Sequence, residues 1–302
     1  MTRILITGAG GNVGRALLTG LAGHEVLATD VAPGYERLDV TGGDADRVIG
    51  VFRPEVVVHL ASIVTPPRGS TRDFEWRVDV QGSRNVLNAC LAHGVRRLVV
   101  TSSGAAYGYH ADNPVPLRET DPVRGNVEFA YSDHKRQVEE MLAEARARHP
   151  ALEQVVLRVG TVLGEGVDNQ ITALFRRPRL LKVAGADSPF VFIWTEDLAR
   201  ILIRAATEGP AGIFNVAGDG ALTVDDLAAA MGKPVLTLPA WALKAALGVA
   251  RPLHLSRYGP EQVRFLQYRP VLDNTALKSV FGYTPQRTSA QVFALWRDWA
   301  KP

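Results

Sequence analysis

Short apolar runs alternate with amphipathic helical patterns from the start of the chain to residue 158. Runs rich in β-branched residues predict strands over residues 3–7, 25–30, 56–59, 96–101 and 154–158. Apolar residues at helical spacing predict helices over 12–21, 45–52, 74–92 and 128–148. Because nearly all-apolar strands are typical of a parallel sheet that is covered on both faces, the pattern predicts a doubly wound α/β domain.

Two adjacent arginines, Arg96 and Arg97, interrupt this pattern at the start of the fourth predicted strand. They precede the apolar run Leu98-Val99-Val100. Because arginine is seldom fully buried without a partner, we expect this strand to begin with its tip in solvent.

The pattern becomes irregular after residue 158. A strand over 190–193, a helix over 195–206 and a strand over 213–216 look like further parts of the first domain. That domain is predicted to span 1–162, with 190–217 returning to it. Residues 163–189 and 218–302 carry short elements and frequent prolines, and they predict a smaller C-terminal α/β lobe that binds substrate. A substrate is expected to lie between the two lobes.

Composition narrows the class of protein. The chain has 302 residues, of which 46% are hydrophobic and 22% charged, so it can bury a sizeable core. The net charge of +3 comes without a basic stripe, so nucleic-acid binding is not expected. No apolar stretch approaches the ~18 residues of a membrane span, and the N-terminus lacks the pattern of a signal peptide. We therefore predict a cytoplasmic protein that is not bound to a membrane.

The cysteine and histidine positions give no sign of a metal site. A single cysteine, Cys90, cannot form an internal disulfide or a zinc cluster. His110, His134 and His149 share no metal-ligand spacing with acidic residues. No metal is predicted.

A glycine-rich turn follows the first predicted strand and opens the first predicted helix, reading Gly8-Ala9-Gly10-Gly11-Asn12-Val13-Gly14. Glycines there permit a tight turn and a close approach of the backbone to a pyrophosphate. The free N–H groups and the dipole of the helix N-terminus attract that anion. The residues predicted to bind a dinucleotide here are Gly8, Gly11, Asn12, Val13 and Gly14.

Asp30 ends the second predicted strand. A carboxylate at this point can accept hydrogen bonds from the adenosine ribose and repels a 2′-phosphate, which predicts NAD rather than NADP. The alternative is that Asp30 is an ordinary turn residue.

Tyr131 and Lys135 lie four residues apart within the helix predicted over 128–148. Residues at this spacing are neighbours on one helix face, so the Lys135 ammonium can favour the ionised form of the Tyr131 phenol. The pair is a candidate acid/base unit. The alternative is an ordinary pair on the helix surface.

Further segments carry a resemblance to a known family. They are Leu38-Asp39-Val40, His59-Leu60-Ala61-Ser62, the helix segment 79–87, and the strand and loop Thr101-Ser102-Ser103-Gly104-Ala105-Ala106-Tyr107-Gly108. Together with the glycine turn and the Tyr131/Lys135 pair, they resemble the extended short-chain dehydrogenase/reductase family of NAD-dependent epimerases and dehydratases. The resemblance implies a Rossmann-type fold, a homodimer, and NAD contacts from Asp39, Val40, Leu60, Ala61, Ser62, Tyr131 and Lys135.

The resemblance also implies a mechanism. In it, the phenolate of Tyr131 removes the proton of a substrate hydroxyl, Ser103 hydrogen-bonds the same oxygen, and Lys135 holds the nicotinamide ribose. The first functional hypothesis is an NAD-dependent sugar epimerase that acts on a nucleotide-linked sugar. The second is a dehydrogenase or reductase of a smaller hydroxy or carbonyl compound. The third is a cofactor-binding protein without turnover, which the presence of Ser103, Tyr131 and Lys135 disfavours.

Departures from the family pattern bear on the substrate. Gly104 and Ala105 stand where dehydratases of the family carry an acidic pair, which argues against dehydration. Phe190 replaces an arginine that contacts the diphosphate of sugar nucleotides, and it is either a core residue or part of the pocket. Thr161 replaces an asparagine, and Arg176, Arg177, Arg179 or Arg264 could supply the positive charge from a different position. The residues predicted to contact substrate are therefore Ser103, Thr161, Phe190 and Arg264.

Overall fold

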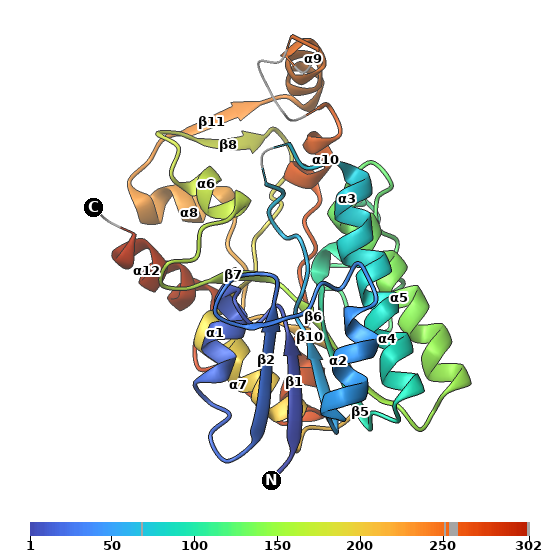
Figure 1. Ribbon diagram of the computed structural model, residues 1–302. Coiled ribbons are helices and arrows are strands. Elements are labelled where there is room, and N and C mark those ends of the chain that lie inside the picture. Colours follow the sequence, from blue (N-terminus) through green and yellow to red (C-terminus); the bar gives the residue numbers. More distant parts are fainter. Residues whose placement is uncertain (68, 251, 254–258, 301–302) are drawn as a thin grey trace.

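A central sheet of seven parallel strands organises the computed structural model, which describes residues 1–67, 69–250, 252–253 and 259–300 (Figure 1). Its strands are β1 (Arg3–Thr7), β2 (Glu25–Asp30), β3 (Glu36–Arg37), β4 (Val56–His59), β5 (Arg97–Ser103), β6 (Glu153–Val159) and β10 (Gly212–Val216). Their order is β10-β6-β5-β4-β1-β2-β3. The order reverses between β1 and β4, the point at which such sheets bind ligands beyond the carboxyl ends of their strands.

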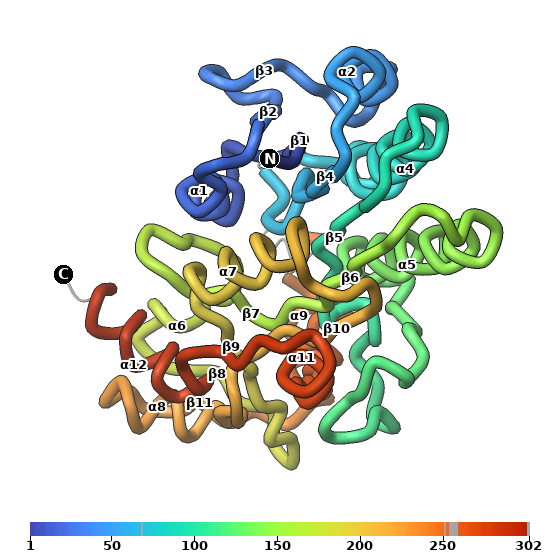
Figure 2. The backbone as a smooth tube through the Cα atoms, turned by 90° about the horizontal axis from the view of Figure 1, so that it is seen from below, coloured from blue at the N-terminus to red at the C-terminus, as the bar shows by residue number. Residues whose placement is uncertain are grey.

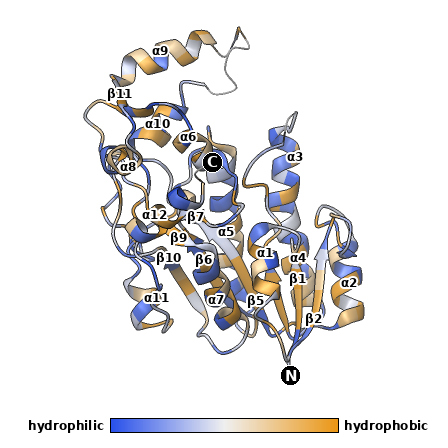
Figure 3. Ribbon diagram, turned by 90° about the vertical axis from the view of Figure 1, so that its left-hand side faces the viewer, coloured by the Kyte–Doolittle hydropathy of each residue, from blue (hydrophilic) through white to orange (hydrophobic). Residues whose placement is uncertain are grey.

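Helices cover both faces of this sheet (Figure 2). One face carries α1 (Asn12–Leu18) and α7 (Thr195–Ala206), and the other carries α2 (Asp44–Phe52), α4 (Gly82–Ala92) and α5 (Ala130–Arg148). Within β1, Ile4 and Ile6 pack in the first core layer and Leu5 in the second. This two-sided burial explains the hydrophobic colour along β1 in Figure 3, and the predicted α/β fold is confirmed.

The second lobe lies beyond the carboxyl ends of the strands (Figure 1). It contains two small sheets, formed by β8 (Leu180–Val183) with β11 (Val235–Leu238) and by β7 (Thr161–Leu163) with β9 (Phe192–Trp194). Its helices are α6 (Gln170–Phe175), α8 (Val224–Met231), α9 (Ala240–Ala250), α10 (Gln262–Gln267) and α12 (Ser289–Trp299), while α11 (Thr275–Ser279) packs against β10. The chain returns to the large sheet through α7 and β10, whereas β9 pairs with β7.

The helix predicted over 74–92 is not one regular helix. It consists of α3 (Arg72–Trp76), the π-helical turn η1 (Arg77–Gln81) and α4. A π turn widens the helical repeat by one residue and occurs often at functional sites. Its residue Asp79 is buried, which the apolar periodicity did not predict.

The expectation that β5 begins with its tip in solvent is wrong for Arg97, whose side chain is 8% exposed. Its Nη1 donates hydrogen bonds to the carbonyl oxygens of Ala205 (2.8 Å) and Gly209 (2.7 Å), and its Nε lies 2.7 Å from Glu153 Oε2. The end of a helix leaves carbonyl groups without partners, and the guanidinium bonds one of them, Ala205 in the last turn of α7, together with Gly209 in the loop that follows. Only Arg96 extends into solvent.

Three further features concern membrane spans, metal sites and the single cysteine. None of the described helices combines the length and the apolar character that crossing a bilayer requires. In the same part of the chain, no group of three or more His, Cys, Asp and Glu side chains could hold a metal ion. Cys90 is buried in α4, and burial raises the pKa of its thiol.

Candidate active site

The glycine turn between β1 and α1 can be built only with glycine at two positions. Gly8 has φ of +72°, and a Cβ there would lie 2.7 Å from the backbone nitrogen of Ala61. A Cβ on Gly14 would lie 2.6 Å from the carbonyl oxygen of Gly8. Asn12 and Val13 are the first residues of α1. The cap residue before them, Gly11, has no side chain that could bond the first N–H groups of the helix. The turn therefore fits a pyrophosphate at an uncapped helix N-terminus.

Asp30 lies at the rim of this turn. Its Oδ2 accepts a hydrogen bond from the backbone N–H of Gly10 (2.8 Å), and its Oδ1 accepts one from Ala32 (2.9 Å). A carboxylate has about four acceptor positions, so these two bonds leave capacity for ribose hydroxyls. By its contacts Asp30 orders the turn, and its role as a ribose acceptor stays a prediction.

The other residues predicted to contact NAD lie along the same edge of the sheet. Asp39 Oδ1 accepts hydrogen bonds from the N–H and the hydroxyl of Thr41, so this carboxylate orders its own turn. Val40 is buried, and its side chain would contact a Cβ at Gly82. After β4, Leu60 and Ala61 pass beside Gly8, and the Ser62 hydroxyl points back toward η1.

Ser103, Tyr131 and Lys135 come from two elements that pack together at this edge. Ser103 is the last residue of β5, and its Oγ accepts a hydrogen bond from the Ala105 N–H (3.1 Å). Lys135 Nζ donates to the carbonyl oxygen of Thr101 (3.0 Å) and lies 5.6 Å from the centre of the Tyr131 ring. The short helix η2 (Gly104–Tyr107), which follows Ser103, packs against α5.

The buried His59 experiences the charge of Lys135. His59 Nδ1 is 2.7 Å from Thr7 Oγ1, and its Nε2 is 3.0 Å from Ser83 Oγ. Burial, assisted by the charge of Lys135, lowers the pKa of His59 to about 3. His59 is therefore neutral at pH 7, and it connects β4 to β1 and α4 through hydrogen bonds.

Asp79 connects the turn after β4 to the helix that bears Lys135. Its Oδ1 accepts hydrogen bonds from Ser62 Oγ (2.9 Å) and the Ile63 N–H (2.8 Å), and its Oδ2 lies 3.2 Å from His134 Nδ1. Burial raises the pKa of Asp79, but hydrogen bonds and the charge of Lys135 outweigh burial and lower it. Asp79 was not among the predicted site residues. The same helical segment also carries Glu75, Arg77 and Arg84, so a charge at this position gave no signal that it would be buried.

A second buried network joins β5 to its other neighbouring strand, β6, and to α5. Arg158 on β6 makes hydrogen bonds from Nε and Nη2 to the Glu139 carboxylate on α5, and Nη1 donates to the Tyr107 hydroxyl (2.8 Å). Ser102 Oγ also donates to Glu139, at 2.5 Å. Burial raises the pKa of Tyr107 to about 12, so this phenol keeps its proton. The network fixes α5 against the strand that ends at Ser103.

The residues predicted to contact substrate are more scattered. Thr161 begins β7, and its N–H donates to Val191 O (3.1 Å). Phe190 is 4% exposed and belongs to an aromatic cluster, in which its ring stacks on Phe192 with centres 5.8 Å apart. Arg264 on α10 is 53% exposed and pairs with Glu128 (2.8 Å), three residues before Tyr131.

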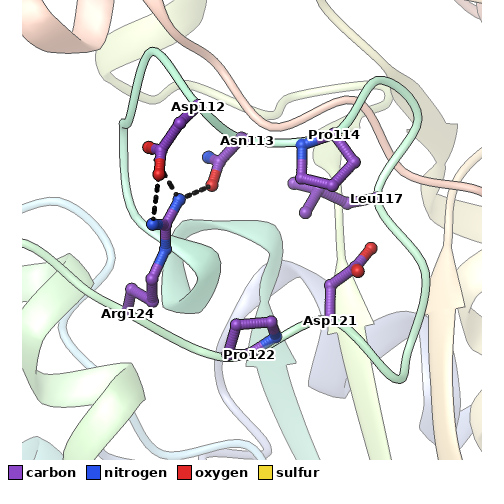
Figure 4. Close-up of a pocket in the computed structure, with 7 residues that line it drawn as sticks. All are labelled: Asp112, Asn113, Pro114, Leu117, Asp121, Pro122 and Arg124. Atoms are coloured by element: carbon purple, nitrogen blue, oxygen red, sulfur yellow. Dashed lines mark hydrogen bonds and ion pairs between the residues drawn. The ribbon is translucent and has the colours of Figure 1, made fainter.

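A surface pocket lies in the loop between η2 and α5 (Figure 4). Arg124 occupies one side of it and is bonded to Asp112 (2.8 and 3.0 Å) and to Asn113 (2.7 Å). None of the catalytic candidates lines this pocket. It is therefore separate from the candidate active site.

Comparison with known sequences gives a family and several relatives. The sequence model described as the NAD dependent epimerase/dehydratase family matches residues 4–217. The chain is 26% identical over 307 residues to the uncharacterized protein Rv0501 of Mycobacterium tuberculosis, covering 96% of this chain and 82% of the relative. It is 33% identical over 129 residues to the decarboxylating sterol-4-alpha-carboxylate 3-dehydrogenase erg26 of Schizosaccharomyces pombe, covering 43% of this chain and 36% of that protein.

Comparison with solved structures supports the fold. The UDP-glucose 4-epimerase of Thermus thermophilus, solved in complex with NAD, superposes with a TM-score of 0.73. The two proteins are 24% identical, and the match covers 98% of each chain. At this identity the likeness shows a shared fold.

Proposed function

The chain belongs to the NAD dependent epimerase/dehydratase family and is an NAD-dependent enzyme, and we propose that it moves hydride reversibly at a carbinol carbon of a nucleotide-linked sugar. The observation that carries the proposal is the placement of Lys135. Its ammonium is fixed on the Thr101 carbonyl and lies beside the Tyr131 ring, at the edge of the sheet where Ser103 ends β5.

The chemistry follows from these positions. The Tyr131 phenol, beside which Lys135 lies, is the group that would accept the proton of a substrate hydroxyl. Ser103 presents a hydroxyl that can bond the same substrate oxygen. Bound NAD supplies the hydride acceptor. Elimination of water is not proposed, because Gly104 and Ala105 carry no acidic group.

The nucleotide-linked sugar is supported by the likeness to UDP-glucose 4-epimerase. A second candidate is the dehydrogenation of a smaller hydroxy compound. Two observations favour it: Phe190 lies in the aromatic cluster of the second lobe, and one relative, 33% identical over 129 residues, is a dehydrogenase. The homodimer that the resemblance implies stays a prediction, which light scattering of the purified protein checks.

The test removes one hydroxyl. Tyr131→Phe should abolish turnover and leave NAD affinity within about twofold, because the ring and Lys135 remain. Tyr283→Phe is the matched control, since the Tyr283 hydroxyl bonds Asp197 on α7 and should not affect turnover. Activity retained by Tyr131→Phe would remove Tyr131 from the mechanism.

The products separate the two candidates. An epimerase returns the hydride, so NADH does not accumulate as substrate is consumed. NADH formed in proportion to the substrate consumed would exclude the epimerase and leave the dehydrogenase. Absorbance at the NADH band during turnover of UDP-sugars and of unlinked hydroxy compounds measures this difference.

A further inference from the structure

Arg269, which follows α10, is a buried cation without an acidic partner. The residue is 9% exposed. Its guanidinium lies 3.8 Å from the centre of the Phe190 ring and 4.9 Å from that of Phe265. Among the side chains that the structure describes, no carboxylate forms an ion pair with it. Aromatic faces stabilise a cation only in part, so the charge is incompletely compensated.

The hydrogen bonds of Arg269 use only one side of its guanidinium. Nη1 donates to the carbonyl oxygen (2.6 Å) and to the hydroxyl (3.1 Å) of Ser188. Nε is enclosed and has no hydrogen-bond partner among the described residues, and the hydrogen bonds of Arg269 to these residues come from its backbone N–H and Nη1, not from Nη2. Nε–H and Nη2–H point in the same direction and form an edge that matches two oxygens of a carboxylate or phosphate. The edge suited to an oxyanion is therefore the one left without acceptors.

The arrangement is costly for the fold. Burial lowers the pKa of Arg269 to about 9, although the group still carries its proton at pH 7. Ser188, which accepts the hydrogen bonds from Nη1, has a backbone φ of +34°. Residues other than glycine rarely adopt this conformation. Strain of this kind concentrates at ligand sites, where the surrounding structure maintains it.

A chain of aromatic rings connects Arg269 to the segment that precedes Tyr131. Tyr109 is buried, and its ring makes edge-to-face contacts with Phe265 (5.3 Å) and with Phe129 (5.1 Å). Phe129 precedes α5 directly, two residues before Tyr131. The pKa of Tyr109 is raised mainly by burial, with an added contribution from Tyr131 and an opposing one from Arg269. Arg269 and the N-terminal end of α5 are therefore linked through the rings of Phe265, Tyr109 and Phe129.

We propose that Arg269 binds an anionic group of the substrate, a phosphate or a carboxylate, through Nε and Nη2. The proposal deepens the proposed function and rests on it for one point, that substrate reaches Tyr131 beside the second lobe. It assigns the cation to Arg269 in place of Arg264, whose guanidinium already pairs with Glu128. Phe190 then acts as the support on which this guanidinium stacks.

The experiment measures binding rather than turnover, so it is independent of the hydride chemistry. UDP, D-glucuronate and neutral D-glucose are titrated into the full chain with NAD present, by calorimetry. We expect at least one of the two anions to bind. Binding of UDP alone identifies a phosphate as the anion, and binding of D-glucuronate identifies a carboxylate. Failure of both anions to bind would overturn the proposal.

Two variants connect that binding to Arg269. Arg269→Met should weaken anion binding by roughly tenfold or more, as expected for lost charge-assisted hydrogen bonds. Arg269→Lys, which keeps the charge but not the two-point edge, should also bind more weakly. Arg148→Met removes an arginine that is 70% exposed and pairs with Glu144, and it should bind as the wild type does.

Thermal unfolding without anion separates recognition from a structural role. Because Arg269→Met removes a buried charge that lacks a counter-ion, its midpoint should equal or exceed that of the wild type. A lower midpoint together with unchanged anion affinity would show that Arg269 is only structural.

Discussion

Acid should destabilise the protein through His59, and the size of the effect can be calculated. In the unfolded chain a histidine titrates near ~6.5, whereas in the fold burial and the charge of Lys135 lower the pKa of His59 to about 3. Between these two values the unfolded state binds the extra proton, so stability rises with pH across this window. The contribution is fully present above about pH 6.5 and is lost as the pH falls toward 3.

The magnitude follows from about 1.4 kcal/mol for each pH unit of the window. At pH 5 the unfolding free energy should be about 2 kcal/mol lower than at pH 8 because of this group alone, with a limit of about 5 kcal/mol below pH 3. Two charged groups face the imidazole, Lys135 and Asp79. The pKa of Asp79 is lowered, so this carboxylate stays ionised at pH 5.

The assay is urea unfolding followed by tryptophan fluorescence at pH 8 and pH 5, for the wild type and for His59→Gln. Gln can still bond one of the two hydroxyls but does not titrate, so the loss between the two pH values should shrink by about 2 kcal/mol. The exposed His149 is the matched control, and His149→Gln should keep the pH dependence of the wild type. Equal pH dependence in the wild type and His59→Gln would refute a buried neutral His59.

Two further predictions concern cofactor choice and the support of β5. Asp30→Ala should weaken NAD much more than NADP, because it removes the ribose acceptor and the repulsion of a 2′-phosphate together; equal losses in calorimetry would mean that Asp30 only orders its turn. Glu139→Leu leaves the buried Arg158 without its anion and should cost about 3–5 kcal/mol in urea unfolding, whereas adding Arg158→Met should recover most of that loss. A double variant no more stable than the single one would contradict the charge argument.

Local rules of sequence were sufficient for the turn after β1 and for the large sheet, except for its two-residue edge strand β3, which was not predicted. A parallel strand covered on both faces needs apolar residues at every position, so its run is visible without alternation. The backbone of Gly8 likewise requires glycine for a reason that acts within a few residues, and the glycine turn is correspondingly plain in the sequence. Lys135 and Tyr131 share a helix face by simple spacing.

The features that escaped prediction depend on contacts between distant segments. Arg97 looks like an exposed residue until the carbonyls of Ala205 and Gly209 are in place, and these lie more than a hundred residues further along the chain. Asp79 lies in a π turn, where it is buried and accepts a hydrogen bond from Ser62. No periodicity encodes such a turn, since it inserts one residue into the repeat that periodicity assumes.

Phe190 shows why a substitution within a motif can mislead when it is considered alone. In the sequence alone, Phe190 indicates that the arginine expected to bind substrate at this position has been lost. In the fold its ring lies directly against the guanidinium of Arg269, so the position supports a cation rather than lacking one. The positive charge is that of Arg269, which comes from a separate segment of the chain. Ser188, two residues before Phe190, accepts a hydrogen bond from Nη1 and leaves the edge formed by Nε and Nη2 without a partner. Replacing Arg269 is therefore expected to weaken substrate binding directly. Replacing Phe190 is expected to weaken it only to the extent that the Arg269 guanidinium shifts from its position on the ring.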